Sequence, residues 1–202
     1  NSPDWIINCA AYTNVDKAEK EKELALKING EAPKEIAKAI KEIGGKLLHI
    51  STDFVFNGKT NIPYKTNSPK NPINAYGYTK SIGEDNVLNI LEPGSEVIIL
   101  RTSWLMGPLG NNFATKILKF LKEGREIKVI YDQISSPTNT TNLANACWKT
   151  ILQIDCSFIN QKKSILHWTN DGVASWYDIA FSIGQISERI GLLKSIPKIN
   201  PI

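Results

Sequence analysis

The chain of 202 residues has few of the side chains that hold metal ions or form disulfides, with only three cysteines and two histidines. Cys9, Cys147 and Cys156 lie far apart and form no CxxC pair, so no zinc site can be assembled at the usual spacings. A sparse, odd number of cysteines indicates reduced thiols, which are typical of cytoplasmic proteins. We therefore expect a cytoplasmic protein without a metal site.

Long apolar runs are also missing, and a membrane-spanning helix needs about 20 mainly apolar residues. Residues 1–4 show neither the basic nor the apolar part of a signal peptide. The net charge is only +4, and the lysine-rich stretch 16–46 holds eight lysines but also seven acidic residues. This mixture is typical of a solvated helix face rather than of a nucleic-acid-binding stripe. We expect neither a membrane nor a nucleic acid as partner.

What the sequence does contain is an alternation of short apolar runs and helical periodicities, which predicts an α/β fold with a parallel sheet flanked by helices. His49, His167, Trp148 and Trp168 are interpreted as packed core residues. Strands are expected at 5–11, 46–51, 97–100, 127–131 and 164–168, and helices at 16–44, 76–91, 111–123, 142–154 and 175–190, the last with Ser175 as its N-cap.

Ligands of open parallel sheets bind at the carboxyl ends of the strands. The segment after the first strand, 8–13 (NCAAYT), has small side chains that let a flat ligand approach the backbone. It fits tight packing of strand against helix equally well. After the second strand come the hydroxyls of Ser51 and Thr52 and the carboxylate of Asp53, although a turn that closes the strand is the more ordinary interpretation.

A third candidate is the YxxxK motif formed by Tyr76 and Lys80, which share one face of the predicted helix. A tyrosine phenol has an ordinary pKa near 10, and a neighbouring ammonium lowers it, so the pair is a proton donor tuned towards neutral pH. The motif also occurs by chance on exposed helix faces. Tyr78 lies between the two residues, but only Tyr76 has a lysine four positions later, so we predict that Tyr76 is the catalytic tyrosine.

Five blocks in order give a more specific signal than any of these motifs. They are NCAAYTNVDKAE (Asn8–Glu19), HISTDFVFNG (His49–Gly58), NPINAYGYTKSIGE (Asn71–Glu84), RTSWLMGPLGNNF (Arg101–Phe113) and DQISSPT (Asp132–Thr138). Through these blocks the chain resembles the extended short-chain dehydrogenase/reductases, and within them the dTDP-4-dehydrorhamnose reductases.

The resemblance implies a Rossmann-like parallel sheet and a smaller α/β substrate lobe. By this likeness, residues 1–104 form the core of the NAD(P)-binding Rossmann domain without its first strands. Residues 105–202 form mostly the substrate-binding lobe, and 139–170 return to the Rossmann domain. The chain is accordingly expected to be truncated at both ends.

The implied reaction is the NADPH-dependent reduction of the C4 keto group of dTDP-4-dehydro-L-rhamnose to dTDP-L-rhamnose, in nucleotide-sugar and surface-polysaccharide biosynthesis. By the same resemblance, Tyr76 protonates the keto oxygen and Thr52 hydrogen-bonds it, while Lys80 lowers the pKa of the tyrosine and holds the nicotinamide ribose. The cofactor is NADPH, with NADH as the alternative. The resemblance leaves Mg²⁺ and a homodimer open, and no pattern in this sequence supports Mg²⁺.

The resemblance further assigns residues to the two ligands. It places Ala11, Tyr12, Thr13, the backbone near Ile50, Tyr76 and Lys80 at the cofactor, Thr52, Asp53 and Trp104 at the substrate, and Asn111, Asn112, Gln133 and Thr138 near the substrate lobe.

Two departures from the family pattern stand out. The 13 glycines include no GxxGxxG or GxGxxG, the turn that binds the cofactor's pyrophosphate in such enzymes. Phe54 stands where the family has a tyrosine. Two other functions stay open: a nucleotide-sugar epimerase or dehydratase of the same extended family, for which Asp53 would be the acid, and a non-catalytic regulatory subunit resembling the methionine adenosyltransferase β subunit.

Overall fold

The computed structural model describes residues 2–155 and 164–202. The chain divides into two compact units: unit 1 is Asn1–Thr102 with Ala146–Trp168, and unit 2 is Ser103–Asn145 with Thr169–Ile202. Cys9 and Cys147 are free thiols, and Cys156 lies outside the described residues. None of the helices in the described part is both long and apolar enough to cross a membrane.

Unit 1 is built on a four-stranded sheet in which all neighbouring strands are parallel. In sheet order the strands are β1 (Trp5–Asn8), β2 (Lys46–Thr52), β3 (Val97–Thr102) and β8 (Ile165–His167). The central strand β3 is buried along its whole length, as expected of a strand covered on both faces. It runs two residues beyond its predicted end because Arg101 and Thr102 pair with Ser51 and Thr52 of β2.

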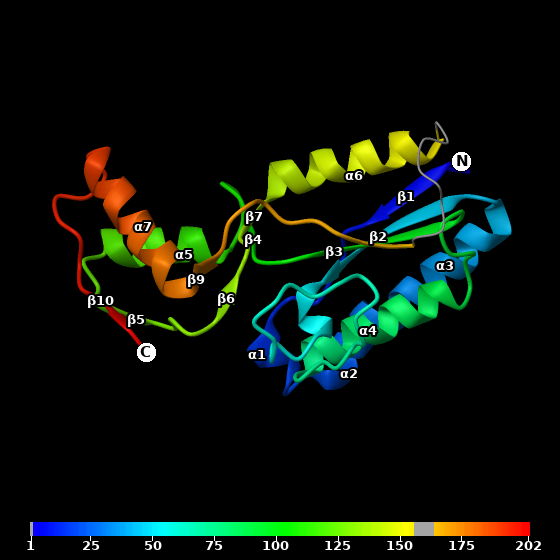
Figure 1. The fold of residues 1–202 in the computed structure, drawn as a ribbon, viewed down its shortest axis with the longest axis horizontal. Helices are drawn as coiled ribbons and strands as arrows, with labels where there is room; N and C mark the ends of the chain where they lie inside the picture. The colour runs from blue at the N-terminus through cyan, green and yellow to red at the C-terminus, as the bar shows by residue number, and fades with distance from the viewer. Residues whose placement is uncertain (1, 156–163) are drawn as a thin grey trace. The chain divides into compact units, whose positions relative to one another are not determined.

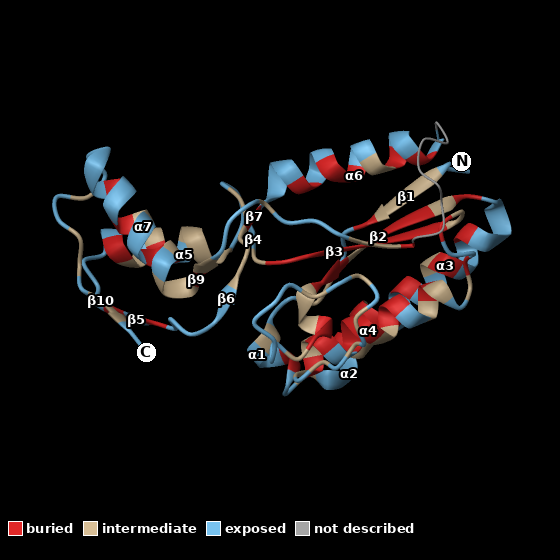
Figure 2. Ribbon diagram, viewed as in Figure 1, coloured by how far each residue is buried: buried red, intermediate tan, exposed pale blue. Residues whose placement is uncertain are grey.

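Helices cover both faces of this sheet (Figure 1). The helices α3 (Ala32–Ile43) and α4 (Ala75–Leu88) pack on one face, and α6 (Thr140–Asp155), from Ala146 onward, lies along the other. The buried residues concentrate on the strands and on the helix faces turned towards them (Figure 2). Aliphatic side chains of α3, α4 and the strands form the core beneath the sheet: Ala37, Ile40, Leu47, Val87, Leu91, Val97 and Ile99. The predicted α/β fold with a parallel sheet flanked by helices is confirmed.

The single helix predicted over 16–44 is wrong, because the structure breaks it into four pieces. They are α1 (Val15–Ala18), α2 (Lys22–Leu26), the π-helical turn η1 (Lys27–Glu31) and α3. The π turn buries Asn29 and Gly30 against α4, so closely that a Cβ on Gly83 would lie 2.1 Å from the Asn29 carbonyl oxygen. Periodicity could not reveal the break, since the apolar spacing continues through it. Such π turns are frequent at functional sites.

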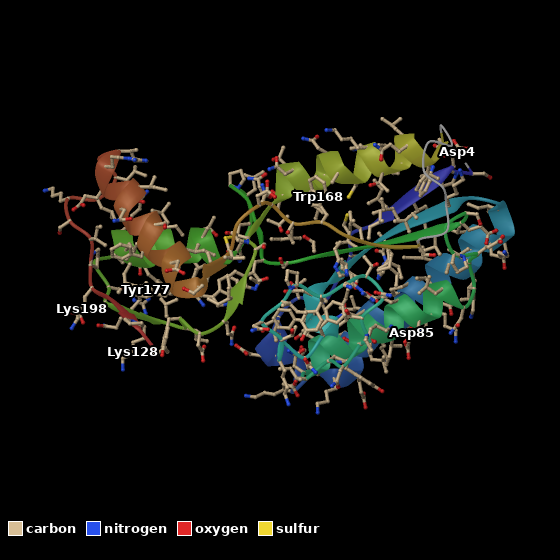
Figure 3. All side chains as sticks on the ribbon, viewed as in Figure 1. Asp4, Asp85, Lys128, Trp168, Tyr177 and Lys198 are labelled. Atoms are coloured by element: carbon tan, nitrogen blue, oxygen red, sulfur yellow. The ribbon has the colours of Figure 1, made fainter. Side chains whose placement is uncertain are left out.

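Three of the predicted core residues are exposed. Trp148 is 60% and Trp168 40% exposed, and His167 is also on the surface. On α6 the buried stripe is Ala146, Cys147, Ile151 and Ile154, so Trp148 points away from it. Trp168, labelled in Figure 3, directly follows the last residue of β8.

Unit 2 consists of two amphipathic helices and pairs of short strands. Its helices begin at capping boxes, made by Asn112 with Thr115 and by Ser175 with Asp178, so the predicted Ser175 N-cap is confirmed. Lys128 and Lys198, labelled in Figure 3, lie on and just before two strands that pair in parallel. The elements are α5 (Phe113–Lys122), α7 (Trp176–Arg189), and the paired strands β4 (Leu105–Met106) with β7 (Thr138–Asn139), β5 (Ile127–Val129) with β10 (Ile199–Pro201), and β6 (Ile134–Ser135) with β9 (Ala174–Ser175).

Candidate active site

Two buried asparagines hold the backbone of the segment after β1 in place through hydrogen bonds. The Oδ1 atom of Asn8 accepts a hydrogen bond from the Ala10 N–H at 3.1 Å. Asn29, from the π turn, binds both polar backbone groups of Tyr12. Its Oδ1 accepts a hydrogen bond from the Tyr12 N–H at 2.8 Å, and its Nδ2 donates one to the Tyr12 carbonyl at 3.1 Å. The Tyr12 hydroxyl donates to Glu21 at 2.7 Å. The backbone between Ala10 and Tyr12 is therefore fixed in place, which is the condition for a flat ligand to lie on it.

The predicted cofactor-lining residues of this segment differ in exposure. Thr13 is exposed, and Ala11 and Tyr12 are half-buried. Cys9, also exposed, belongs to the same strip. Asn29 was missed from the sequence because its role depends on the π turn, which brings a residue distant in the chain against Tyr12.

Thr52 ends β2, and the turn expected to close this strand is confirmed. Its hydroxyl oxygen accepts a hydrogen bond from the Phe54 N–H at 3.2 Å, which caps the short 3₁₀ turn η2 (Asp53–Val55). The same hydroxyl donates to Asp53 at 3.2 Å, and it acts to lower the pKa of the nearby Tyr76 phenol. The turn that closes the strand thus also presents a hydroxyl to the tyrosine.

The first turn of α4 carries Tyr76 to this hydroxyl. Asn74 caps the helix by accepting from the Gly77 N–H at 2.8 Å. Gly77 is required by close packing, because a Cβ there would lie 2.1 Å from the Phe54 carbonyl oxygen. The Phe54 ring meets the Tyr76 ring edge to face at 5.5 Å, while Tyr78 is 59% exposed. Of the two tyrosines, the structure brings Tyr76 to Thr52 and points Tyr78 to solvent.

Lys80 lies one turn further along α4 and is only 1% exposed. Its Nζ donates to the Ile50 carbonyl at 2.7 Å and lies 3.4 Å from the Nε2 atom of His49. Burial lowers the pKa of Lys80 to about 8, against the opposing charges of Glu84 and Cys9. A buried lysine with this pKa can change its charge close to neutral pH.

The pKa of Tyr76 is raised, whereas the sequence predicted that the neighbouring lysine lowers it. Burial is the largest cause, the nearby Thr52 hydroxyl opposes it, and the negative charge of Asp53 adds to it. The phenol therefore keeps its proton at neutral pH in this structure. A protonated phenol next to a second hydroxyl can donate a proton to an oxygen atom placed between them.

A buried ion pair anchors α4 to the sheet beneath these groups. The Arg101 guanidinium on β3 donates two hydrogen bonds to Glu84, at 2.8 and 2.7 Å, and the Ser51 hydroxyl on β2 donates a third at 2.6 Å. Glu84 is fully buried and Arg101 is 3% exposed. Tyr76, Lys80 and Glu84 recur every four residues, so one helix face carries the tyrosine, the lysine and the anchor. Glu84 was not predicted from the sequence, although its spacing from Tyr76 and Lys80 was a signal for it.

His49 is fully buried, as a core residue should be, but its partners are polar. Its Nδ1 atom lies 3.1 Å from the Asn8 amide nitrogen, and its Nε2 faces Lys80. The apolar neighbours seen along the strand sequence were misleading, because the residues that meet His49 come from β1 and α4. Burial lowers its pKa well below 6.5, and the charge of Lys80 lowers it further, so the imidazole is neutral.

In unit 2, Trp104 has a strained backbone with a φ of 44°. Its ring stacks on Trp176 at a centroid distance of 3.6 Å, and its carbonyl accepts from the Thr138 N–H at 3.1 Å. Asn112 caps α5, while Asn111 and Gln133 are exposed. Within residues 2–155 and 164–202, no three potential ligands among His, Cys, Asp and Glu cluster to hold a metal ion.

Comparison with known proteins gives a consistent set of relatives. All 202 residues match the family model of the RmlD substrate binding domain. A spore coat polysaccharide biosynthesis protein, SpsK of Bacillus subtilis, is 39% identical over 90% of this chain and 60% of its own length. The dTDP-4-dehydrorhamnose reductase of Escherichia coli K12 is 36% identical over 99% of this chain and 65% of its own length.

A solved structure agrees with these sequence relatives. The dTDP-4-dehydrorhamnose reductase of Bacillus anthracis, in complex with NADP, superposes with a TM-score of 0.87 at 36% identity, and the match covers 100% of this chain and 66% of that one. The chain thus spans 60 to 65% of the length of the two curated relatives.

Proposed function

Since the chain belongs to the family of the RmlD substrate binding domain, we propose that its protein reduces the C4 keto group of dTDP-4-dehydro-L-rhamnose with NADPH. The observation that carries the proposal is that the Thr52 hydroxyl and the Tyr76 phenol lie together at the carboxyl end of the sheet, near enough for Thr52 to act on the pKa of Tyr76. Relatives named as reductases of this substrate, and a solved structure of one with NADP, support it.

In the proposed reaction the keto oxygen lies between the Tyr76 phenol and the Thr52 hydroxyl. Tyr76 donates a hydrogen bond to it, and Thr52 does so by turning its hydroxyl hydrogen from Asp53 to the substrate; both bonds stabilise the negative charge that develops on the oxygen. Tyr76 then gives up its proton to the oxygen, and on the family resemblance we assign the stabilisation of the resulting phenolate to the positive charge of Lys80. When bound, the nicotinamide dinucleotide supplies the hydride that completes the alcohol.

The residues after β1 fit the nicotinamide half of such a cofactor. The strip from Cys9 to Thr13 begins with small side chains and is partly exposed, and Asn8 and Asn29 hold its backbone in place. A flat ring can therefore lie against it without a conformational change. Lys80 has hydrogen atoms beyond the one given to Ile50, and we assign them to ribose hydroxyls. NADPH rather than NADH is proposed from the NADP complex of the B. anthracis relative.

The assignments of Asp53 and Trp104 to the sugar nucleotide, and of residues 105–202 to a substrate lobe, are proposed on the family resemblance. The rigid stack of Trp104 on Trp176 supplies a flat apolar surface of the kind on which sugars and bases pack.

The test is turnover by the full-length protein. Purified protein, NADPH and dTDP-4-dehydro-L-rhamnose should give one molecule of dTDP-L-rhamnose for each NADPH consumed, with the product identified by NMR. The reduced product offered in place of the keto sugar is the matched control and should consume no NADPH. Binding of the sugar nucleotide without NADPH consumption would reject the reductase in favour of an epimerase, a dehydratase or a regulatory subunit.

A further inference from the structure

A buried chain of hydrogen bonds runs from the backbone after β1 to Lys80. It starts at the Ala10 N–H, which donates to Asn8 Oδ1 at 3.1 Å. Asn8 Nδ2 then meets His49 Nδ1 at 3.1 Å, and His49 Nε2 meets Lys80 Nζ at 3.4 Å. The chain ends where Lys80 donates to the Ile50 carbonyl at 2.7 Å. The reaction proposed above gives His49 no role and uses Asn8 only to hold the backbone after β1.

The two backbone groups fix the direction of every bond in this chain. An N–H can only donate, so the oxygen of the Asn8 amide faces Ala10 and its NH₂ group faces His49. The His49 Nδ1 atom must therefore accept a hydrogen bond. A neutral imidazole that accepts at Nδ1 carries its hydrogen on Nε2, and that hydrogen is aimed at Lys80.

The nitrogen of Lys80 can complete the chain only as a neutral amine. An ammonium group has no lone pair, so its hydrogens would oppose the Nε2–H of His49. A neutral amine accepts from His49 and still donates to Ile50. We propose that His49, held in its Nε2–H tautomer by Asn8, is a positioning residue that sets the pH at which Lys80 gives up its charge.

The other charged groups around Lys80 act in the opposite sense. Glu84 on the same helix and Cys9 after β1 both favour the ammonium form, and Asp53 of η2 acts on Tyr76. The pKa of Lys80 is nevertheless about 8, with burial as the main cause. The effect on catalysis rests on the proposed function: since the positive charge assists Tyr76, the rate should fall as the pH rises through the pKa of Lys80.

The experiment follows the Lys80 titration directly, in the full-length protein, by the ¹³Cε shift of labelled lysine. The variant His49→Asn keeps an acceptor for the Asn8 amide but removes the hydrogen that faces Lys80. We expect its Lys80 midpoint, and the high-pH limb of kcat/KM, to move upward by about one pH unit, a tenfold change in the protonation equilibrium. His167→Asn, at the other histidine, is the matched control and should leave both unchanged. An unmoved midpoint in His49→Asn overturns the proposal.

A second measurement needs no variant and therefore does not depend on the folding of one. The ¹⁵N shifts of the His49 ring in the wild-type protein report which nitrogen carries the hydrogen, and we expect Nε2. A hydrogen on Nδ1 overturns the proposal. If the wild type reduces no keto sugar while its Lys80 midpoint follows the His49 substitution, the proposed function fails and the role of His49 in setting the charge of Lys80 stands.

Discussion

The ion pair between Glu84 and Arg101 offers the sharpest test of how α4 is held on the sheet. Glu84→Gln keeps the size of the side chain and part of its hydrogen bonding but removes its charge. Arg101 is then left buried at 3% exposure without its counter-charge. Breaking a buried pair in this way costs about 3–5 kcal/mol, a large part of the roughly 5–15 kcal/mol by which a domain is stable.

The neighbouring ion pair on the same helix supplies the control. Asp85, labelled in Figure 3, pairs with Lys70 at 2.6 Å, but its side chain is 59% exposed. Exposed pairs contribute about 0–1 kcal/mol, so Asp85→Asn should change the free energy of unfolding by no more than that. The two substitutions remove the same charge from adjacent positions and differ mainly in burial.

Urea unfolding followed by circular dichroism measures both free energies. We expect the midpoint of Glu84→Gln to fall well below that of Asp85→Asn with a similar m-value. The double variant Glu84→Leu with Arg101→Met should recover most of the lost stability, because it leaves no charge unpaired. A loss in Glu84→Gln no greater than in Asp85→Asn would refute the view that this pair anchors the helix.

Two further predictions follow from the same region. Burial would raise the pKa of Glu84, but Arg101, Ser51 and Lys70 leave it lowered. Glu84 therefore stabilises the fold above its ordinary pKa of 4.5, and this contribution is lost as the pH falls through the lowered pKa. In acid titrations of the unfolding free energy, wild type should lose more stability than Glu84→Gln, and parallel curves would contradict this. Gly83→Ala should lower the free energy of unfolding, measured in urea, by about 1–3 kcal/mol, because its Cβ would meet the Asn29 carbonyl oxygen at 2.1 Å. A rise in that free energy, as expected for alanine in an open helix position, would show that the π turn is not closely packed.

The sequence was sufficient to predict the elements that carry their own periodicity. The strands of unit 1 and the helix beginning near Tyr76 appear where apolar spacing placed them, although the first strand ends at Asn8 rather than at residue 11. The proximity of Thr52 and Tyr76 could also be predicted, because strand ends and helix faces can be recognised from local residues. The break at Asn29 was missed because the apolar spacing continues through it. Gly30 was the local signal, and the close packing of Gly83 against Asn29 could be seen only in the fold.

The surroundings of the titratable groups were equally hidden from the sequence. The strand around His49 is apolar along the chain, yet Asn8 and Lys80 reach it from β1 and α4. The raised pKa of Tyr76 has the same origin, because burial and Asp53 act through the folded structure. Local sequence identifies the groups, and tertiary packing decides their charge.

The central claim, that the Tyr76 phenol protonates the substrate oxygen, is tested most directly by removing one hydroxyl. Tyr76→Phe in the full-length protein should lower kcat for NADPH-dependent reduction of dTDP-4-dehydro-L-rhamnose at least about a hundredfold, the scale of general acid catalysis. Tyr78→Phe removes the same group from an exposed position two residues away and should leave kcat unchanged. Equal rates in wild type and Tyr76→Phe would contradict the account.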